Sequence, residues 1–181
     1  MTSKRTVALA IFSLFAFSPL VAHAQDAPTD TYPLPSTTVL PSPRNRSAEQ
    51  IALVKVVLSE QYAYVYSKKR RLIATIAVST GLDNSTPTGS FKVFSKSRET
   101  YYELNPEERM RWMVRFTKGR QGGNIGFHSI PFKVTAEGEV KFFTPVGIAP
   151  SSHGCIRVRD DDAKWLFANM EIGTRVVVKK T

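Results

Sequence analysis

The sequence predicts a single, mostly β domain with one main helix near its C-terminal end. Most of the chain after residue 50 consists of short runs rich in β-branched and aromatic residues, separated by polar or glycine-containing turns. Only Asp160–Met170 has apolar residues at the spacing of a helix. The chain has 181 residues, which is enough for one domain with a substantial core and too few for two comfortable ones.

The predicted elements follow one another along the chain. Strands are expected at residues 51–59, 62–67, 71–80, 90–95, 111–117, 140–146 and 174–180. Polar residues 68–70, Gly81 and the turn Pro87–Gly89 separate the early strands. The helix at 160–170 begins with three aspartates, which are favourable at the positive end of a helix dipole, and Gly173 ends it.

The N-terminal part of the chain is predicted to lie outside this domain, which then comprises residues 48–181. Residues 1–24 have a basic head, an apolar run and the small-x-small end Ala22-His23-Ala24, an order typical of a cleaved secretory signal peptide. An uncleaved anchor in the inner membrane is the alternative, although the apolar run is short and Pro19 interrupts it. Residues 25–47 contain five prolines among polar residues, which is typical of a semi-extended linker.

The formal net charge of +10, together with the predicted export, indicates which classes of binding partner to expect. An exported basic protein meets anionic envelope polymers and phospholipid surfaces, so we do not expect nucleic acid as a partner. Positive charge that only aids solubility is the alternative. The short linker, with no second module in view, favours the periplasm as the location, and we expect a monomer.

The only cysteine of the chain, Cys155, lies in the stretch SSHGCIRV, just before the predicted helix. In an oxidising compartment a lone cysteine is inert and buried, paired with another molecule, or a reactive nucleophile. Its neighbours favour the nucleophile. Gly154 permits a tight turn whose amides are candidates to stabilise an oxyanion, and a histidine that could activate the thiol is available at His153 or at His128 in GGNIGFHSI.

Two alternatives to a catalytic cysteine remain at this point. His128, His153 and Cys155 could be three zinc ligands, but no fourth ligand lies at a persuasive spacing, so no metal is expected. A non-catalytic module that binds the cell wall would explain the basic charge. It would not explain a free thiol kept beside histidines.

The stretch SHGCIR, preceded by FHS, resembles the active-site signature of the L,D-transpeptidase catalytic domain, the YkuD-type fold. The segments IAVSTG and TPTGSFKV resemble further segments of that family in the same order, and the similarity spans about residues 51–178. The resemblance implies a β-sandwich or mixed barrel with one main helix after the cysteine motif. It also implies an enzyme that modifies peptidoglycan without a cofactor.

The resemblance further implies a mechanism on tetrapeptide stems of peptidoglycan. Cys155 would be the nucleophile that forms a thioester as D-alanine leaves, and His128 would be the general base and then the acid. An acceptor amine would complete crosslinking, anchoring of an envelope protein or exchange of a D-amino acid. If water is the acceptor, the enzyme is an L,D-carboxypeptidase or a hydrolase of wall peptides or protein–wall links.

Neighbouring residues would support this chemistry. By analogy with the family, the carbonyl of Ser129 would orient His128. The amides of Gly154 and Cys155, with His153, would bind the oxyanion. Ser152 would brace the motif, and the residues expected to contact substrate are Ser152, Arg157, Met113 and Phe127. Arg157 could instead form a structural salt bridge with Asp160–Asp162.

Two longer segments are expected to shape the site. Residues 95–113 are predicted to form a loop over the cleft, with Met113 and Trp112 near the donor, although Trp112 could equally be part of the core. Residues 133–150 lengthen the connection between His128 and Cys155. They could form a β-hairpin that narrows the cleft, or they could shape the side on which the acceptor enters.

Overall fold

The computed structural model describes residues 50–120 and 122–181. The predicted signal peptide (1–24) and linker (25–47) therefore lie outside the described residues. In the part that the structure describes, no helix is long and apolar enough to cross a membrane.

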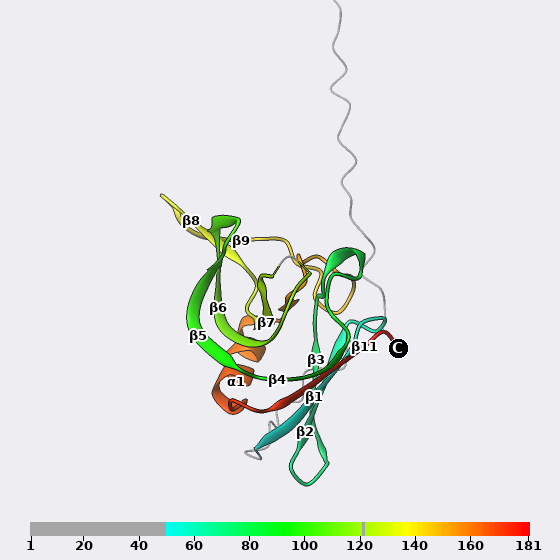
Figure 1. Cartoon of the computed structure of the whole chain (residues 1–181). Coiled ribbons are helices and arrows are strands. Elements are labelled where there is room, and N and C mark those ends of the chain that lie inside the picture. Colours follow the sequence, from blue (N-terminus) through cyan, green and yellow to red (C-terminus); the bar gives the residue numbers. More distant parts are fainter. Residues whose placement is uncertain (1–49, 121) are drawn as a thin grey trace, which may run out of the picture. The chain divides into compact units, whose positions relative to one another are not determined.

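The described domain is mostly β, as predicted, with two sheets and one α-helix (Figure 1). Its elements are β1 (Ile51–Val57), β2 (Tyr62–Ser67), β3 (Leu72–Ala77), the 3₁₀ turn η1 (Leu82–Asn84), β4 (Gly89–Lys92), β5 (Ser95–Tyr102), β6 (Asn105–Lys118), β7 (Asn124–His128), β8 (Phe132–Thr135), β9 (Gly138–Lys141), β10 (Ile156–Arg157), α1 (Asp160–Asn169) and β11 (Arg175–Lys179). The first sheet has the order β3-β2-β1-β11-β4. The second has the order β10-β7-β6-β8-β9, with β5 paired to β6.

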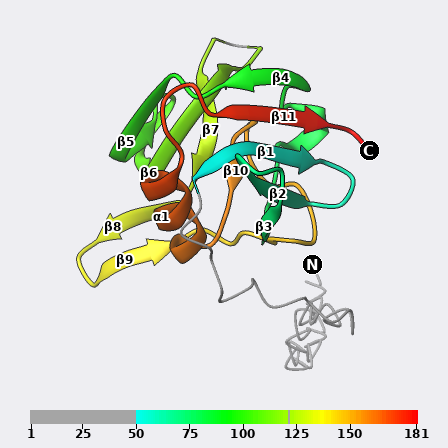
Figure 2. The ribbon, with the colours of Figure 1, turned by 90° about the horizontal axis from the view of Figure 1, so that it is seen from below.

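The first sheet joins the two ends of the domain. β1, β2 and β3 form an antiparallel meander, whereas β11 pairs with β1 in parallel, from Leu53 opposite Arg175 to Val57 opposite Lys179. Figure 2 shows β1 and β11 side by side, with β4 on the other side of β11. Val176 and Val178 on one face of β11 are buried and Val177 on the other is partly buried, which accounts for the apolar run of this strand.

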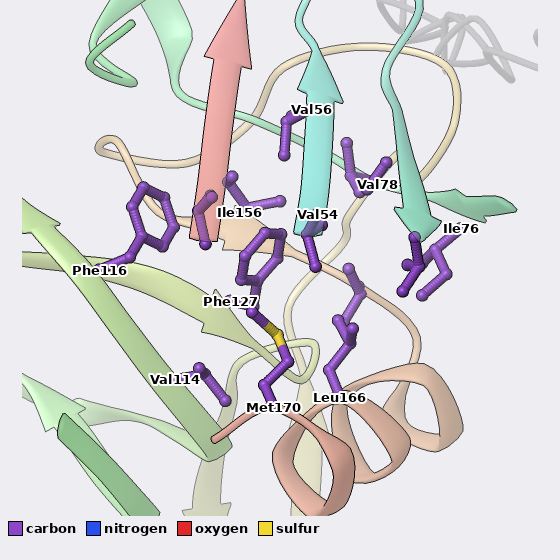
Figure 3. Close-up of a cluster of buried hydrophobic side chains, with 14 of the residues drawn as sticks. Val54, Val56, Ile76, Val78, Val114, Phe116, Phe127, Ile156, Leu166 and Met170 are labelled. Carbon is purple, nitrogen blue, oxygen red and sulfur yellow. The ribbon is translucent and has the colours of Figure 1, made fainter. Parts of the chain in front are cut away.

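The core forms where side chains of both sheets and of α1 meet (Figure 3). The helix contributes Ala163 and Leu166, and Met170 follows at its end, so the apolar spacing read from the sequence does mark the buried face. Phe127 of β7 is fully buried among them. Burying a side chain of this size contributes about 1.5–3 kcal/mol relative to leaving it exposed.

Several predicted strands have different bounds in the structure. The strand expected at 71–80 ends at Ala77, because the chain then leaves the sheet and makes isolated bridges from Ser79 to Arg157 and from Gly81 to Ser152. The strand expected at 140–146 ends at Lys141 as part of the β8–β9 hairpin. The long insert therefore contains the expected β-hairpin, while the expectation that this hairpin narrows the cleft depends on which residues line the cavity.

The prediction of a loop at 95–113 is wrong. These residues form most of an antiparallel pair, β5 and β6, that turns between Tyr102 and Asn105. β5 has the sequence SKSRETYY and contains no fully buried residue, so no apolar alternation marked it as a strand. The tip of this pair and one face of β6 lie at the cavity described next.

Candidate active site

The register of three neighbouring strands decides which side chains meet at the site. β10 pairs with β7 in parallel, with Ile156 opposite Phe127 and Arg157 opposite His128. Aligned residues on neighbouring strands point to the same face, and successive residues point to opposite faces. Phe127 and Ile156 accordingly point into the core. His128, Arg157 and Cys155 share the other face.

This other face borders a cavity of about 760 Å³, a volume in the range of sites for small molecules and short peptides, roughly 300–1,000 Å³. Strands β6 and β7, the cysteine segment, η1 and the tip between β5 and β6 contribute to its lining. The lining residues used below are Glu108, Met113, Arg115, His128, Cys155 and Arg157. None of the lining residues comes from β8 or β9, so the insert hairpin does not narrow this cavity.

The alternation of side chains along strand β6 shifts at Trp112, so that different positions face the cavity before and after this residue. Before this point Glu108 and Met110 line the cavity, and after it Met113 and Arg115 do. Two residues thus separate Met110 from Met113, where a regular strand has one. Trp112 has φ 59°, a left-handed conformation uncommon for non-glycine residues, and this shifts the alternation by one residue.

His128 is held as a neutral base. Its ring Nδ1 lies 2.6 Å from the carbonyl oxygen of Ser129, which is the contact that the resemblance implies. A carbonyl only accepts hydrogen bonds, so Nδ1 carries the proton and Nε2 keeps its lone pair. Burial lowers the pKa of His128 to about 4; the Ser129 contact acts against this shift and Arg157 adds to it. The imidazole is consequently uncharged at neutral pH.

Cys155 is half-buried and reduced, and its Sγ lies 3.6 Å from the carbonyl oxygen of Asn124. Burial raises the pKa of the thiol above its ordinary value. The backbone amide of Gly126 and the guanidinium groups of Arg157 and Arg115 act in the opposite direction without overcoming burial. At neutral pH the cavity is therefore lined by a protonated thiol and a neutral imidazole, and a reaction of this thiol as a nucleophile would need a base.

We expect alkylation of Cys155 by iodoacetamide to rise about tenfold for each pH unit from pH 6 to pH 9, because only the thiolate reacts. The rate constant can be followed by intact mass over this range. A plateau of fast reaction below pH 7 would contradict the neutral pair and indicate a preformed thiolate–imidazolium pair. His128→Gln is the matched control and should show the same slope.

The turn around Cys155 is braced from within. The hydroxyl of Ser152 donates to the carbonyl oxygen of Cys155 at 2.5 Å and accepts from the amide of Gly154 at 3.0 Å. Gly154 has φ 137°, which favours glycine, and an added Cβ would lie 2.9 Å from Ile125 Cδ1. Ser152 thus holds the backbone of the motif, as expected.

Segments far away in the sequence hold the same turn from outside. Thr86 Oγ1 accepts from the amide of Gly81 and donates to the carbonyl oxygen of Gly154, at 2.7 and 2.8 Å. The amide of Ser152 donates to the carbonyl oxygen of Thr80 at 3.0 Å. The IAVSTG and TPTGSFKV segments therefore support the cysteine turn, which gives their resemblance to the family a structural reason.

Arg157 forms a buried ion pair with Glu108. Its Nη2 lies 2.7 Å from Glu108 Oε1, and the two residues are only 6% and 7% exposed. Its Nη1 donates to the carbonyl oxygen of Ser151 at 3.0 Å, whereas its Nε is buried without a partner. The alternative role of Arg157, a structural salt bridge, is found, but its partner is Glu108 rather than Asp160, which pairs with Lys141.

Other predicted residues fall in different places. Met113 is buried at the cavity wall, and Trp112 packs against Phe167 at the edge of the core, which favours its core alternative. Phe127 is part of the core, on the face opposite His128, so the expected contact with substrate does not fit its position. His153 is exposed, and its ring stacks on Tyr102 of β5 with centroids 4.7 Å apart.

The zinc alternative has no ligand cluster in this structure. Across residues 50–120 and 122–181, no group of three or more His, Cys, Asp or Glu side chains is placed to hold a metal ion. His153 stacks on Tyr102 at the surface, whereas His128 is 2% exposed and bonded to Ser129.

The cavity residues that the sequence did not single out include Glu108, Arg115 and Tyr102. The alternation in RWMVRFT does place Arg115 on the face of Met113, so this signal was available. Nothing local marks Glu108, whose position depends on the conformation of Trp112. Tyr102 belongs to a strand that carried no apolar pattern.

The fold and the site together define a β-rich enzyme domain with a cysteine and a histidine on one face of a cavity. The model of YkuD, the L,D-transpeptidase catalytic domain, matches residues 51–178. YciB of Bacillus subtilis strain 168, a predicted L,D-transpeptidase, is 32% identical over 133 residues, covering 69% of this chain and 64% of that protein. L,D-transpeptidase 1 of Mycobacterium tuberculosis strain H37Rv is 25% identical over 135 residues, covering 70% and 50%.

A solved structure of the LD transpeptidase LdtMt1 in complex with imipenem superposes with a TM-score of 0.56, at 25% identity, over 71% of this chain and 59% of that one. The chain therefore belongs to the L,D-transpeptidase (YkuD) catalytic domain family, cysteine-dependent transpeptidases that act on peptidoglycan. It spans 64% and 50% of the lengths of the two curated relatives named above.

Proposed function

We propose that this protein is a peptidoglycan L,D-transpeptidase that acts on tetrapeptide stems through a thioester on Cys155. The observation that carries the proposal is the shared face of Cys155 and His128, with Nδ1 of His128 bonded to the carbonyl of Ser129. Because Nδ1 carries the proton of this bond, Nε2 is the nitrogen that can act as the base.

Acylation follows from the protonation states of the two groups. His128 Nε2 removes the thiol proton as Sγ attacks the carbonyl carbon that precedes the terminal D-alanine. The negative charge then lies on the carbonyl oxygen, and the amide of Cys155 is the proposed donor to it. The amide of Gly154 already donates to Ser152, so its contribution requires that bond to lengthen. When the intermediate collapses, the C–N bond breaks and His128 returns the proton to the D-alanine amine.

Release of the acyl group repeats these steps with a new nucleophile. An acceptor amine attacks the thioester carbon, His128 takes a proton from that amine, and the C–S bond breaks to regenerate the thiol. A stem-peptide amine gives a crosslink, an amine of an envelope protein gives an anchored protein, and a D-amino acid gives an exchanged stem. Water gives L,D-carboxypeptidase activity, which uses the same residues.

We further propose that the protein works in the periplasm as a monomer, tethered or released according to whether residues 1–24 are cleaved. A family that acts on peptidoglycan works outside the cytoplasm, and the basic charge suits an anionic envelope polymer. His153, beside Tyr102 at the cavity, is proposed to position substrate.

The test is the intact mass of the purified protein after incubation with a disaccharide-tetrapeptide. We expect a transient adduct with the mass of the donor minus D-alanine, located on Cys155 and absent in Cys155→Ala. The soluble products then distinguish transfer from hydrolysis. A folded protein whose thiol titrates freely but yields neither adduct nor product would count against tetrapeptide donors and give weight to a binding module.

A further inference from the structure

Arg115 and Cys155 lie in one row across three strands. Arg115 of β6 is opposite Gly126 of β7, and Cys155 directly precedes Ile156, which is opposite Phe127. Cys155 therefore lies beside Gly126, whose amide bonds to the thiol. Two strand spacings place the Cα atoms of Arg115 and Cys155 about 10 Å apart.

No side chain stands between the two residues in this row, because Gly126 has none. The glycine is required by the neighbouring strand, since an added Cβ would lie 2.3 Å from the carbonyl oxygen of Val114. A peptide whose scissile carbonyl lies at Cys155 can therefore extend across Gly126 to Arg115. The distance of about 10 Å corresponds to about three extended residues.

The guanidinium of Arg115 is positioned by neutral groups. Its Nη1 donates to the hydroxyl of Ser97 at 2.8 Å, and its Nη2 is 3.3 Å from the hydroxyl of Thr100. These bonds use two of the five N–H groups of a guanidinium and leave its charge uncompensated. None of the ion pairs recorded in the described part of the chain involves Arg115.

The other arginines that line the cavity are either paired with a carboxylate or exposed to solvent. Arg157 is paired with Glu108, so its charge is already compensated. Arg120 is exposed to solvent, where water and salt weaken its interactions. Arg115 is half-buried, and Glu103 at the tip of the β5–β6 pair acts on it only through space. A guanidinium held in place beside an open cavity, with free N–H groups, is suited to a carboxylate.

We propose that Arg115 binds a carboxylate of the donor stem peptide and so makes the enzyme select acidic stems over amidated ones. The proposal rests on the proposed function, since it requires acylation of Cys155 by a stem peptide. Two carboxylates of the stem are within reach of the row: that of the terminal D-alanine and the distal one of the diamino acid. Both offer the same planar, bidentate partner to a guanidinium.

The experiment compares three synthetic stems, measured as second-order rate constants of acylation of the purified protein by intact mass. One stem has both carboxylates free, one has a C-terminal D-alaninamide, and one has the diamino-acid carboxylate amidated. We expect amidation of the recognised carboxylate to slow acylation about 10- to 100-fold, as for loss of a hydrogen-bonded charge, and the other amide to have little effect. The slowed stem identifies the carboxylate.

Arg115→Gln should bring the acid-to-amide ratio of the recognised carboxylate close to one, and Arg115→Lys should restore part of it. Because the ratio compares two stems on one protein, a loss of folded or active enzyme does not change it. Arg120→Gln is the control cation at the rim and should leave the ratio unchanged.

The proposal is overturned if Arg115→Gln slows all three stems by one common factor, or if it leaves the discrimination as it is in the wild type. It is also overturned if the wild type does not discriminate. Failure of the proposed function would look different, because no stem would then acylate Cys155 of the wild type. In that case the inference about Arg115 would fail as well.

Discussion

His128→Gln should lower the rate of Cys155 acylation by a tetrapeptide stem on the order of 10²- to 10⁴-fold, the usual contribution of a general base. The effect is expected to be this large because the resting thiol is protonated, and His128 keeps an unprotonated Nε2 that can accept its proton. Alkylation by iodoacetamide at pH 9 should change little, since base then forms the thiolate without help. Unchanged acylation would remove His128 from the proposed mechanism.

The same substitution should also change the dependence of stability on pH. The pKa of His128 is about 4 in the folded protein and about 6.5 in the unfolded chain, so the unfolded state binds the extra proton between these values. The stabilisation is present above pH 6.5 and is lost as the pH falls to 4, by about 3 kcal/mol. Urea unfolding at pH 7 and pH 4 should show this loss in the wild type and in His153→Gln, but not in His128→Gln.

Glu108→Ala should lower the free energy of unfolding by about 3–5 kcal/mol, the cost of leaving a buried cation without its partner. Both residues of the Glu108–Arg157 pair are more than nine-tenths buried, so water cannot replace the lost carboxylate. This is a large part of the roughly 5–15 kcal/mol that stabilises a typical domain. Because Arg157 also holds the carbonyl of Ser151, the cysteine turn should loosen as well.

Urea unfolding at pH 7 measures the Glu108→Ala effect, with Glu99→Ala as the matched control. Glu99 pairs with Arg109 at 3.0 Å, but their side chains are 42% and 49% exposed, so its loss should cost at most about 1 kcal/mol. Replacing both partners, as in Glu108→Leu with Arg157→Met, should recover much of the stability. Equal effects of Glu108→Ala and Glu99→Ala would show that the Arg157 pair is not desolvated in solution.

The sequence predicts the β-rich class and the helix because each leaves a local signal, whereas the choice of His128 over His153 as the partner of Cys155 comes only from the resemblance to the family. The apolar residues of α1 form its buried face, and the turn at the SHGC motif is held by a hydrogen bond between residues of the motif itself. Alternation along β7 would also have excluded Phe127 from the site, since neighbours in a strand face opposite ways.

What could not be predicted depends on contacts between distant segments or on unusual backbone. Glu108 meets Arg157 only because Trp112 adopts a left-handed conformation that shifts β6 by one residue. Strand β5 is held by pairing with β6 and by polar side chains, so its sequence reads as a loop. For the salt-bridge alternative of Arg157 the sequence suggests only nearby aspartates, because a partner that folding brings close leaves no signal along the chain.

The parallel pairing of β1 with β11 also sets the order in which the supports of Cys155 can form. A chain made from its N-terminus exposes β1, β2, β3 and β4 first, but β11 must enter between β1 and β4 to close their sheet. Contacts of such long sequence separation also form slowly. Since the segment after β3 braces the cysteine turn, a nascent chain that lacks Arg175–Lys179 carries Cys155 without its finished support. The support of Cys155 thus depends on a strand that follows it in the sequence.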